Sequence, residues 1–241
     1  MYEPRTYRCW IKDGDLVSFT VAVKQTDLYI RARHNLKDKA ITSVLKYRDS
    51  LEKYIRHHPL FLTTLGPYRA EAGAPVIIKE MAKASQIAGV GPMAAVAGAI
   101  AEAVGRDLLR FSPEVIVENG GDIFLKTSKK RLLGIYAGQS PFTGKIGLEI
   151  QSGETPLGVC TSSATVGHSL SLGNADAVIV LSPSTPLADA VATAIGNVVR
   201  DARDIPEAIE KAQSIQRLHG IIIVKEDRIT AWGRVRIVPL S

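Results

Sequence analysis

The sequence predicts an α+β fold in which mixed or antiparallel sheets pack against helices. Segments with strand and helix patterns come in blocks, in the order strands, helices, strands, helices, strands, and lack the regular alternation of a doubly wound sheet. With 241 residues, 46% of them hydrophobic, the chain can bury a substantial core without disulfides or structural metals. We expect one domain, with two lobes at about residues 1–110 and 111–241.

The first strands and the first helix are predicted from residue periodicity. Segments 7–12 and 16–23 flank Asp13-Gly14, a pair typical of a tight hairpin, and segment 26–32 alternates apolar and polar residues. Asn35 is the expected N-cap of a helix over residues 36–56, whose apolar residues follow helical spacing. Because Pro59 restricts the residue before it, this helix must end by His58.

Two further helices are expected on either side of a glycine-rich break at residues 89–92. They cover about residues 76–87 and 93–104, after a loop at 63–75, and the second consists mainly of Ala and Gly, so other backbone can approach it closely. The apolar stretch 89–101 is shorter than the ~20 residues of a membrane-spanning helix. We therefore interpret it as a buried helix and expect no membrane partner.

The rest of the chain is predicted as short strands separated by glycines, then two helices and two closing strands. The expected strands are 115–118, 122–126, 132–136, 146–150, 158–161, 177–181, 221–224 and 229–237, and the expected helices are 186–201 and 206–217.

Charge and cysteine content restrict the partners. The formal net charge is +6, but Lys and Arg are dispersed, and the densest run, residues 126–131, is interpreted as a solvated turn. We therefore expect a small phosphate-bearing ligand and no nucleic acid. Cys9 and Cys160 form neither a disulfide framework nor a zinc pattern, and no apolar signal follows Met1, so a cytoplasmic location is expected.

The helix predicted from Pro186 carries the sharpest chemical pattern. Thr185 is its expected N-cap, and Asp189, Thr193 and Asn197 recur every four residues among Ala, Val, Ile and Gly. A carboxylate and a hydroxyl on one face can bind a hard cation such as Mg2+. The alternative is a polar surface stripe in which Asp189 merely favours the helix dipole.

Three other segments are candidate ligand sites. The run from Asn119 through Gly120 and Gly121 to Asp122 suits either close approach of a ligand or a tight hairpin turn. The small hydroxyl residues after Cys160 can form a phosphate-binding nest, and Cys160 itself is either a nucleophile with His168 as base or a buried inert thiol. Residues 89–98 suit either a phosphate at a helix start or close helix packing.

Taken in chain order, these features resemble the FAD:protein FMN transferase (ApbE-like) superfamily. In that family a strand ends in an Asn/Gly-Gly-Asp/Glu turn, matched here at residues 119–122, and a later helix begins Ala-Asp-Ala-Leu-Ala-Thr, matched at 188–193. The resemblance covers about residues 85–197. The runs beginning at Cys160, Gly167 and Gly173 are most similar to a short, uncharacterised branch of the superfamily.

This resemblance implies an ApbE-like fold with a flavin-nucleotide pocket, and Mg2+ and FAD or FMN as cofactors or substrates. Its expected activity is Mg2+-dependent transfer of a phosphate-linked group such as FMN, with an acceptor protein as partner. The implied metal ligands are Asp189 and Thr193 with a backbone carbonyl. Our hypothesis adds Asp189 and His168 as catalytic residues, the latter as proton donor. It also assigns nucleotide binding to Asn119, Gly120, Gly121, Asp122, Thr161 and Ser162.

The chain also departs from the family pattern. Residues 93–98 contain no lysine where the transferases carry Ala-Lys-Gly, and the family's aromatic segment after its Thr-Ser-Gly turn is missing. Two alternatives follow: a non-catalytic flavin- or nucleotide-binding protein, and a metal-independent hydrolase that uses Cys160 and His168. The apolar strands and the small-residue helix permit a homodimer.

Overall fold

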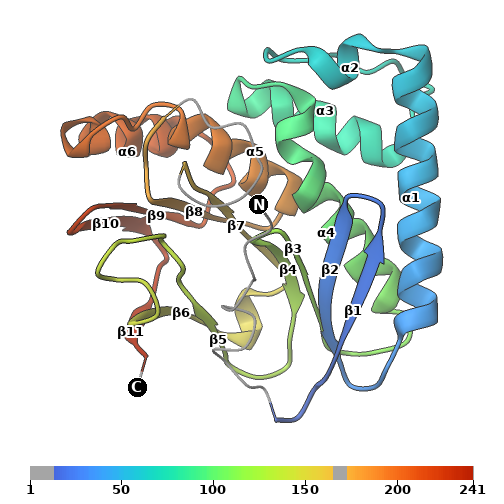
Figure 1. The fold of residues 1–241 in the computed structure, drawn as a ribbon, viewed down its shortest axis with the longest axis horizontal. Coiled ribbons are helices and arrows are strands. Elements are labelled where there is room, and N and C mark those ends of the chain that lie inside the picture. The colour runs from blue at the N-terminus through green and yellow to red at the C-terminus, as the bar shows by residue number, and fades with distance from the viewer. Residues whose placement is uncertain (1–13, 165–172, 241) are drawn as a thin grey trace.

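The computed structural model describes residues 14–164 and 173–240 (Figure 1). The strands are β1 (Val17–Val23), β2 (Thr26–Ala32), β3 (Val115–Asn119), β4 (Asp122–Lys126), β5 (Arg131–Gly134), β6 (Ile146–Ile150), β7 (Leu157–Ser162), β8 (Ala177–Ser182), β9 (Gly220–Lys225), β10 (Arg228–Gly233) and β11 (Ile237–Pro239). The helices are α1 (Lys37–His57), α2 (Leu60–Thr63), α3 (Val76–Ala88), α4 (Val96–Leu108), α5 (Thr185–Gly196) and α6 (Ile205–Ser214), with short 3-10 helices η2 (Pro92–Ala95), η3 (Ser152–Glu154) and η4 (Ala202–Asp204).

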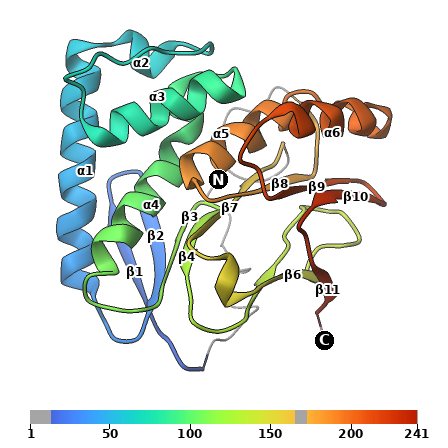
Figure 2. The same cartoon turned by 180° about the vertical axis from the view of Figure 1, so that it is seen from behind.

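Three layers make up the fold. An eight-stranded sheet has the order β1-β2-β3-β4-β7-β8-β9-β10, and a smaller sheet has the order β11-β6-β5. Every strand pair found in the described ranges is antiparallel. The helices cover one face of the large sheet and the small sheet lies against its other face (Figures 1 and 2). The predicted α+β class is confirmed.

The middle strands β8 and β9 of the large sheet carry continuous apolar runs because both of their faces are covered. In β9, Ile221 and Ile223 belong to the core under the helices, whereas Ile222 and Val224 belong to the core under the small sheet. A strand buried on both faces shows a continuous apolar run rather than alternation. This explains why segment 221–224 has no polar residue.

The structure corrects several predicted element ends. Leu36, not Asn35, is the N-cap residue of α1, although the Asn35 side chain accepts a hydrogen bond from the Lys37 N–H at 3.0 Å. Thr185 is the first residue of α5 rather than its N-cap. The predicted helix over residues 186–201 stops at Gly196, whose carbonyl oxygen packs against Gly173, where a Cβ would lie 1.9 Å from it.

Two further ends differ. The helix predicted over residues 93–104 starts as η2 and continues through α4 to Leu108. The strand predicted over residues 229–237 breaks at Gly233, whose φ of 88° ends β10 before β11 begins. The strand predicted at residues 7–12 lies outside the described residues.

The apolar stretch at residues 89–101 packs into the core as predicted. Seven of the residues of α4 are buried: Gly98, Ala99, Ile100, Ala101, Val104, Gly105 and Leu108. Over the described ranges no single helix is long and apolar enough to span a membrane; α3 and the η2–α4 segment pass that length and composition test only as a pair, which is bent by 108°.

Candidate functional site

Four segments that are distant in sequence meet on the helix side of the large sheet. They are the turn between β3 and β4, the end of β7, the first turn of α4 and the first half of α5. Gly120 and Gly121 have φ values of 67° and 102°, as a two-residue hairpin turn requires. The Asn119 side-chain amide donates to the Ala97 carbonyl at 3.0 Å, so the turn is attached to α4.

Asp189 lies at the centre of this arrangement. Its side chain is buried, and its Oδ2 accepts a hydrogen bond from the Gly98 N–H at 2.8 Å. The two helices approach so closely that a Cβ at position 98 would lie 2.6 Å from the Thr185 carbonyl oxygen. Asp189 is therefore an interior carboxylate, and the interpretation of its helix face as a surface stripe is wrong.

Asp122 places a second carboxylate beside the first. It is buried, and its Oδ1 accepts a hydrogen bond from the Thr161 N–H at 3.3 Å. Burial raises the pKa of Asp122 well above its usual value, and the negative charge of Asp189 raises it further. Residues 119–122, for which the sequence left a ligand-binding segment and a tight hairpin turn open, form the hairpin turn, and this turn places the Asp122 carboxylate beside Asp189 of α5.

Among the described residues 14–164 and 173–240, no cation is one of the groups that act most strongly on the pair. Burial raises the pKa of Asp189 to about 7, while hydrogen bonds from the Gly98 and Ala97 N–H groups oppose that shift. The groups that act most strongly on the two carboxylates are N–H groups, the Cys160 thiol and other carboxylates. Such a pair favours binding of a proton or an added cation.

The donor set fits magnesium in its chemistry. Mg2+ takes oxygen ligands, commonly one or two carboxylates, and keeps its other positions for water and substrate phosphates. In the described part of the chain, no group of three or more His, Cys, Asp and Glu side chains is arranged to hold a metal ion. A transition-metal cage is therefore absent from those residues, whereas two adjacent buried carboxylates suit a hard cation.

The other predicted site residues differ in where they lie relative to the Asp122–Asp189 pair. Thr161 contacts Asp122 through its N–H group, as described above. Thr193 lies one turn beyond Asp189 on α5 and is half-buried. Ser162 lies at the far end of α5, where a Cβ at Gly196 would be 3.2 Å from its Oγ. His168 lies outside the described residues.

Cys160 has the properties of an inert buried thiol. Its side chain is completely buried, and Sγ donates to the Thr185 carbonyl oxygen at 3.4 Å. Burial raises the pKa of the Cys160 thiol, and the negative charge of Asp122 raises it further. Because the thiolate is the nucleophile, these surroundings oppose a cysteine hydrolase.

One residue at the site was not predicted. Glu102 of α4 accepts a hydrogen bond from the Thr185 N–H at 2.7 Å and so caps the start of α5. Its signal in the sequence was the spacing of Gly98, Glu102 and Arg106, which places them on one side of a helix. A surface cavity of about 340 Å³ lies elsewhere, between α1 and Pro75, and none of the predicted site residues lines it.

Comparisons with known proteins show the family and the fold of the chain. The family model described as AbpE bacteria matches residues 8–220. The UPF0280 protein of Methanocaldococcus jannaschii is 43% identical over 221 residues, which cover 89% of this chain and 90% of that protein. The UPF0280 protein of Methanococcus aeolicus is 43% identical over 201 residues, 81% of each chain.

Solved structures show the same fold at low sequence identity. The apo flavinyl transferase ApbE of Pseudomonas stutzeri matches with a TM-score of 0.58 and 13% identity, covering 90% of this chain and 93% of that one. The ApbE protein of Thermotoga maritima matches with a TM-score of 0.55 and 12% identity, covering 89% and 96%. These matches confirm the resemblance inferred from the sequence motifs: the chain belongs to the AbpE bacteria family, in its UPF0280 branch, and has the ApbE fold.

Proposed function

We propose that this protein binds Mg2+ and a flavin nucleotide at the Asp122–Asp189 pair and transfers FMN from FAD to an acceptor protein. The observation that carries the proposal is the juxtaposition of two buried carboxylates on which, in the part of the chain that the structure describes, no cation acts as a main influence. The fold shared with a flavinyl transferase supports the choice of ligand.

The metal ligands would be Asp189, the Thr193 hydroxyl and a backbone carbonyl, with Asp122 adding a second negative charge. The Asp189 carboxylate already accepts hydrogen bonds from the Gly98 and Ala97 N–H groups, which hold it in place. When bound, the ion supplies positive charge that neutralises the diphosphate and the oxygen on which negative charge develops.

The chain's own residues would bind and orient the nucleotide. The exposed Gly120 has no side chain to obstruct a phosphate, and the half-buried Thr161 and Ser162 can donate hydroxyl hydrogen bonds to phosphate oxygens. An acceptor hydroxyl oxygen would attack the phosphorus of the FMN half, and the bond from that phosphorus to the bridging oxygen would break. AMP leaves with the bridging oxygen and its electron pair, the acceptor hydroxyl loses its proton, and we assign to His168 the donation of a proton to the departing AMP oxygen, after which the histidine would regain the proton released by the acceptor.

The test is a titration with FAD, with and without Mg2+, in which flavin fluorescence and AMP release are followed together. We expect Mg2+-dependent binding and AMP release in the wild type, and loss of both in Asp189→Asn. The matched control is Asp201→Asn, which removes an exposed carboxylate that bonds Arg203. If Asp189→Asn binds FAD and releases AMP like the control, the site assignment is wrong.

A second candidate function, flavin binding without transfer, is favoured by the missing lysine at residues 93–98. The same titration separates the two functions. Mg2+-dependent fluorescence changes without AMP release, in the presence of an acceptor protein extract, would identify a binding protein.

A further inference from the structure

Helices α4 and α5 cap each other: near the N-terminus of each helix, a backbone N–H donates a hydrogen bond to a carboxylate of the other helix. Neither Ala95 before α4 nor Ser184 before α5 makes a side-chain cap hydrogen bond. Asp189 of α5 instead accepts from the Gly98 N–H near the start of α4, and Glu102 of α4 accepts from the Thr185 N–H at the start of α5. A carboxylate at a helix N-terminus satisfies an unpaired N–H and favours the helix dipole. The two carboxylates therefore set the register between the helices.

Glu102 is itself held in one orientation. Its Oε1 accepts from Arg106 Nε at 2.7 Å, and a second Arg106 nitrogen lies 2.6 Å from the same oxygen. The Arg106 guanidinium lies 5.8 Å from the centroid of the Phe124 ring, and Gly105 lets that ring pack directly on α4. Phe124 stands two residues after Asp122 in β4. The chain of contacts thus joins the strand that carries Asp122 to the helix that carries Asp189.

Thr185 has little room in which to shift. A Cβ at Gly98 would lie 2.6 Å from its carbonyl oxygen, and a Cβ at Gly158 would lie 2.5 Å from its Cα. Asp189 follows four residues later, about one helical turn along α5. Because a helix transmits displacement of its first turn to the next one, any movement of Thr185 relocates the Asp189 carboxylate.

We propose that Glu102 is a positioning residue for the candidate cation site, acting on Asp189 through the N-terminus of α5. This inference rests on the proposed function, since the cation site belongs to it. Glu102 does not touch the cation; it determines where the Asp189 carboxylate stands relative to Gly98 and Asp122. Groups that orient metal ligands typically contribute 10- to 100-fold in metal affinity.

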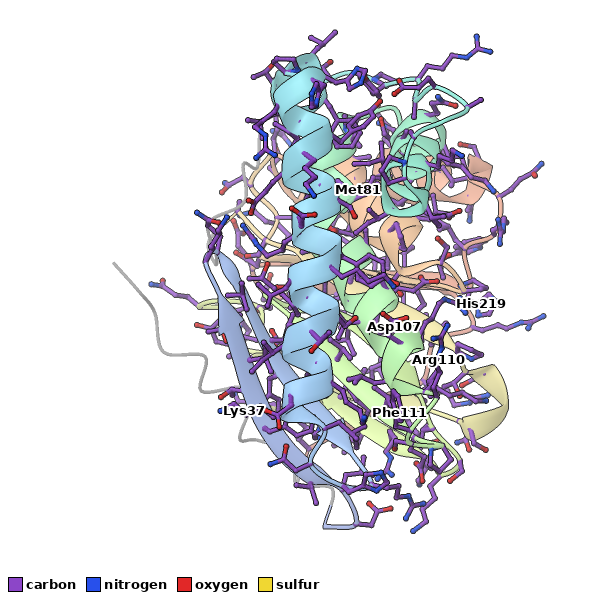
Figure 3. The ribbon with its side chains drawn as sticks, turned by 90° about the vertical axis from the view of Figure 1, so that its right-hand side faces the viewer. Lys37, Met81, Asp107, Arg110, Phe111 and His219 are labelled. Atoms are coloured by element: carbon purple, nitrogen blue, oxygen red, sulfur yellow. The ribbon has the colours of Figure 1, made fainter. Side chains whose placement is uncertain are left out.

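The experiment compares Glu102→Ala, Glu102→Gln and a control on the same helix. The control is Asp107→Ala, because Asp107 accepts a hydrogen bond from Ser43 of α1 at 2.9 Å and ties α4 to a different helix (Figure 3). Mg2+ affinity is measured by calorimetry on folded protein, with thermal unfolding recorded in parallel. We expect Glu102→Ala to bind Mg2+ about 10-fold or more weakly. Glu102→Gln keeps an acceptor oxygen for the Thr185 N–H and should recover most of the affinity, while Asp107→Ala lowers stability only.

A purely structural role for Glu102 would lower the unfolding temperature of Glu102→Ala and leave the affinity of the folded protein unchanged. That result would overturn the proposal. A second readout, amide hydrogen exchange at Gly98, needs no metal: exchange should be faster in Glu102→Ala and unchanged in Asp107→Ala. If the wild type binds no Mg2+, the proposed function fails, and the Gly98 exchange rate still decides whether Glu102 positions Asp189. Equal Gly98 exchange rates in the wild type, Glu102→Ala and Asp107→Ala would refute this positioning role.

Discussion

Two buried carboxylates at opposite ends of the β3–β4 hairpin have opposite electrostatic surroundings. Glu114 immediately precedes β3 at the open end, and Asp122 follows the turn at the closed end. Both side chains are buried. Glu114 is surrounded by cations and hydroxyl groups, whereas Asp122 faces another carboxylate.

The surroundings of Glu114 satisfy its charge completely. Arg33 and Arg131 form ion pairs with it, and Thr127 and Ser128 donate hydroxyl hydrogen bonds at 2.8 and 2.7 Å. Burial alone would raise the pKa of Glu114, but the hydrogen bonds from Ser128, Arg131 and Thr127 hold it at about 2. The interpretation of the run 126–131 as a solvated turn is therefore wrong at its last residue: Arg131 is buried because it pairs with Glu114 and Asp15.

The comparison of Glu114 with Asp122 distinguishes a carboxylate that stabilises the fold from one that is suited to bind a ligand. A buried charge that its own chain neutralises contributes to the fold. A buried charge that the chain leaves uncompensated is costly, and it is retained where a proton or ligand supplies the missing charge. The four predictions below test that distinction, from the largest expected effect to the smallest.

Replacing Glu114 should cause the largest loss of stability. Glu114→Ala removes the buried carboxylate that pairs with Arg131 and leaves Asp15 as the remaining carboxylate partner of that guanidinium, and breaking a buried pair costs about 3–5 kcal/mol. Urea unfolding monitored by circular dichroism measures the loss. Asp49→Ala, which removes an exposed pair with Lys53, is the control and should lose much less. Equal losses in the two variants would show that the Glu114 network is not structural.

The same network predicts acid sensitivity. The pKa of Glu114 falls from its usual 4.5 to about 2 in the folded protein, so its contribution to stability is present above pH 4.5 and is lost as the pH falls toward 2. A shift of this size corresponds to about 3 kcal/mol. Unfolding free energies at pH 6 and pH 3 should differ less in Glu114→Gln than in the wild type. An identical pH dependence in both proteins would contradict the assignment.

Sequence analysis could identify those site residues that differ from their immediate neighbours in the chain. Asp189 stands out because it is charged within an apolar helix, and Asp122 because it follows two adjacent glycines. Both patterns depend on neighbours within a few positions. The family motifs added the expectation that these two segments act together, which the contact between them supports.

What the sequence could not reveal is which distant residues become partners. The hydrogen bond from Gly98 to Asp189 spans 91 positions, and that from Arg33 to Glu114 spans 81. Whether Arg131 is solvated or buried depends on such pairing and not on its basic neighbours. The close packing of Gly173 against the Gly196 carbonyl, at the end of α5, is likewise a contact that helix periodicity does not encode.

A methyl group at position 98 should disturb the closed-end site directly. In Gly98→Ala the new Cβ would lie 2.6 Å from the Thr185 carbonyl oxygen and 2.9 Å from the Asp189 Cβ, so the helices must separate. Overpacking of this kind costs about 1–3 kcal/mol, and we expect Mg2+ affinity to fall as well. Gly153→Ala is the control, since nothing lies within 4 Å of its added Cβ. Retained stability and affinity in Gly98→Ala would mean that the close contact is not needed.

Neutralising Asp122 should have the smallest effect on stability, with a sign opposite to that at Glu114. In Asp122→Asn the amide oxygen can still accept the Thr161 N–H, while the repulsion between Asp122 and Asp189 disappears. Removing an uncompensated buried charge should therefore raise the unfolding free energy, by about 1 kcal/mol, in metal-free buffer at pH 8. Mg2+ affinity should fall in the same variant, because the cation loses one of the two negative charges that attract it. Urea unfolding and calorimetry measure the two quantities on one preparation. If Asp122→Asn is less stable than the wild type, as we expect for Glu114→Ala, then the charge of Asp122 is compensated within the chain. In that case the closed end of the hairpin is not the ligand site.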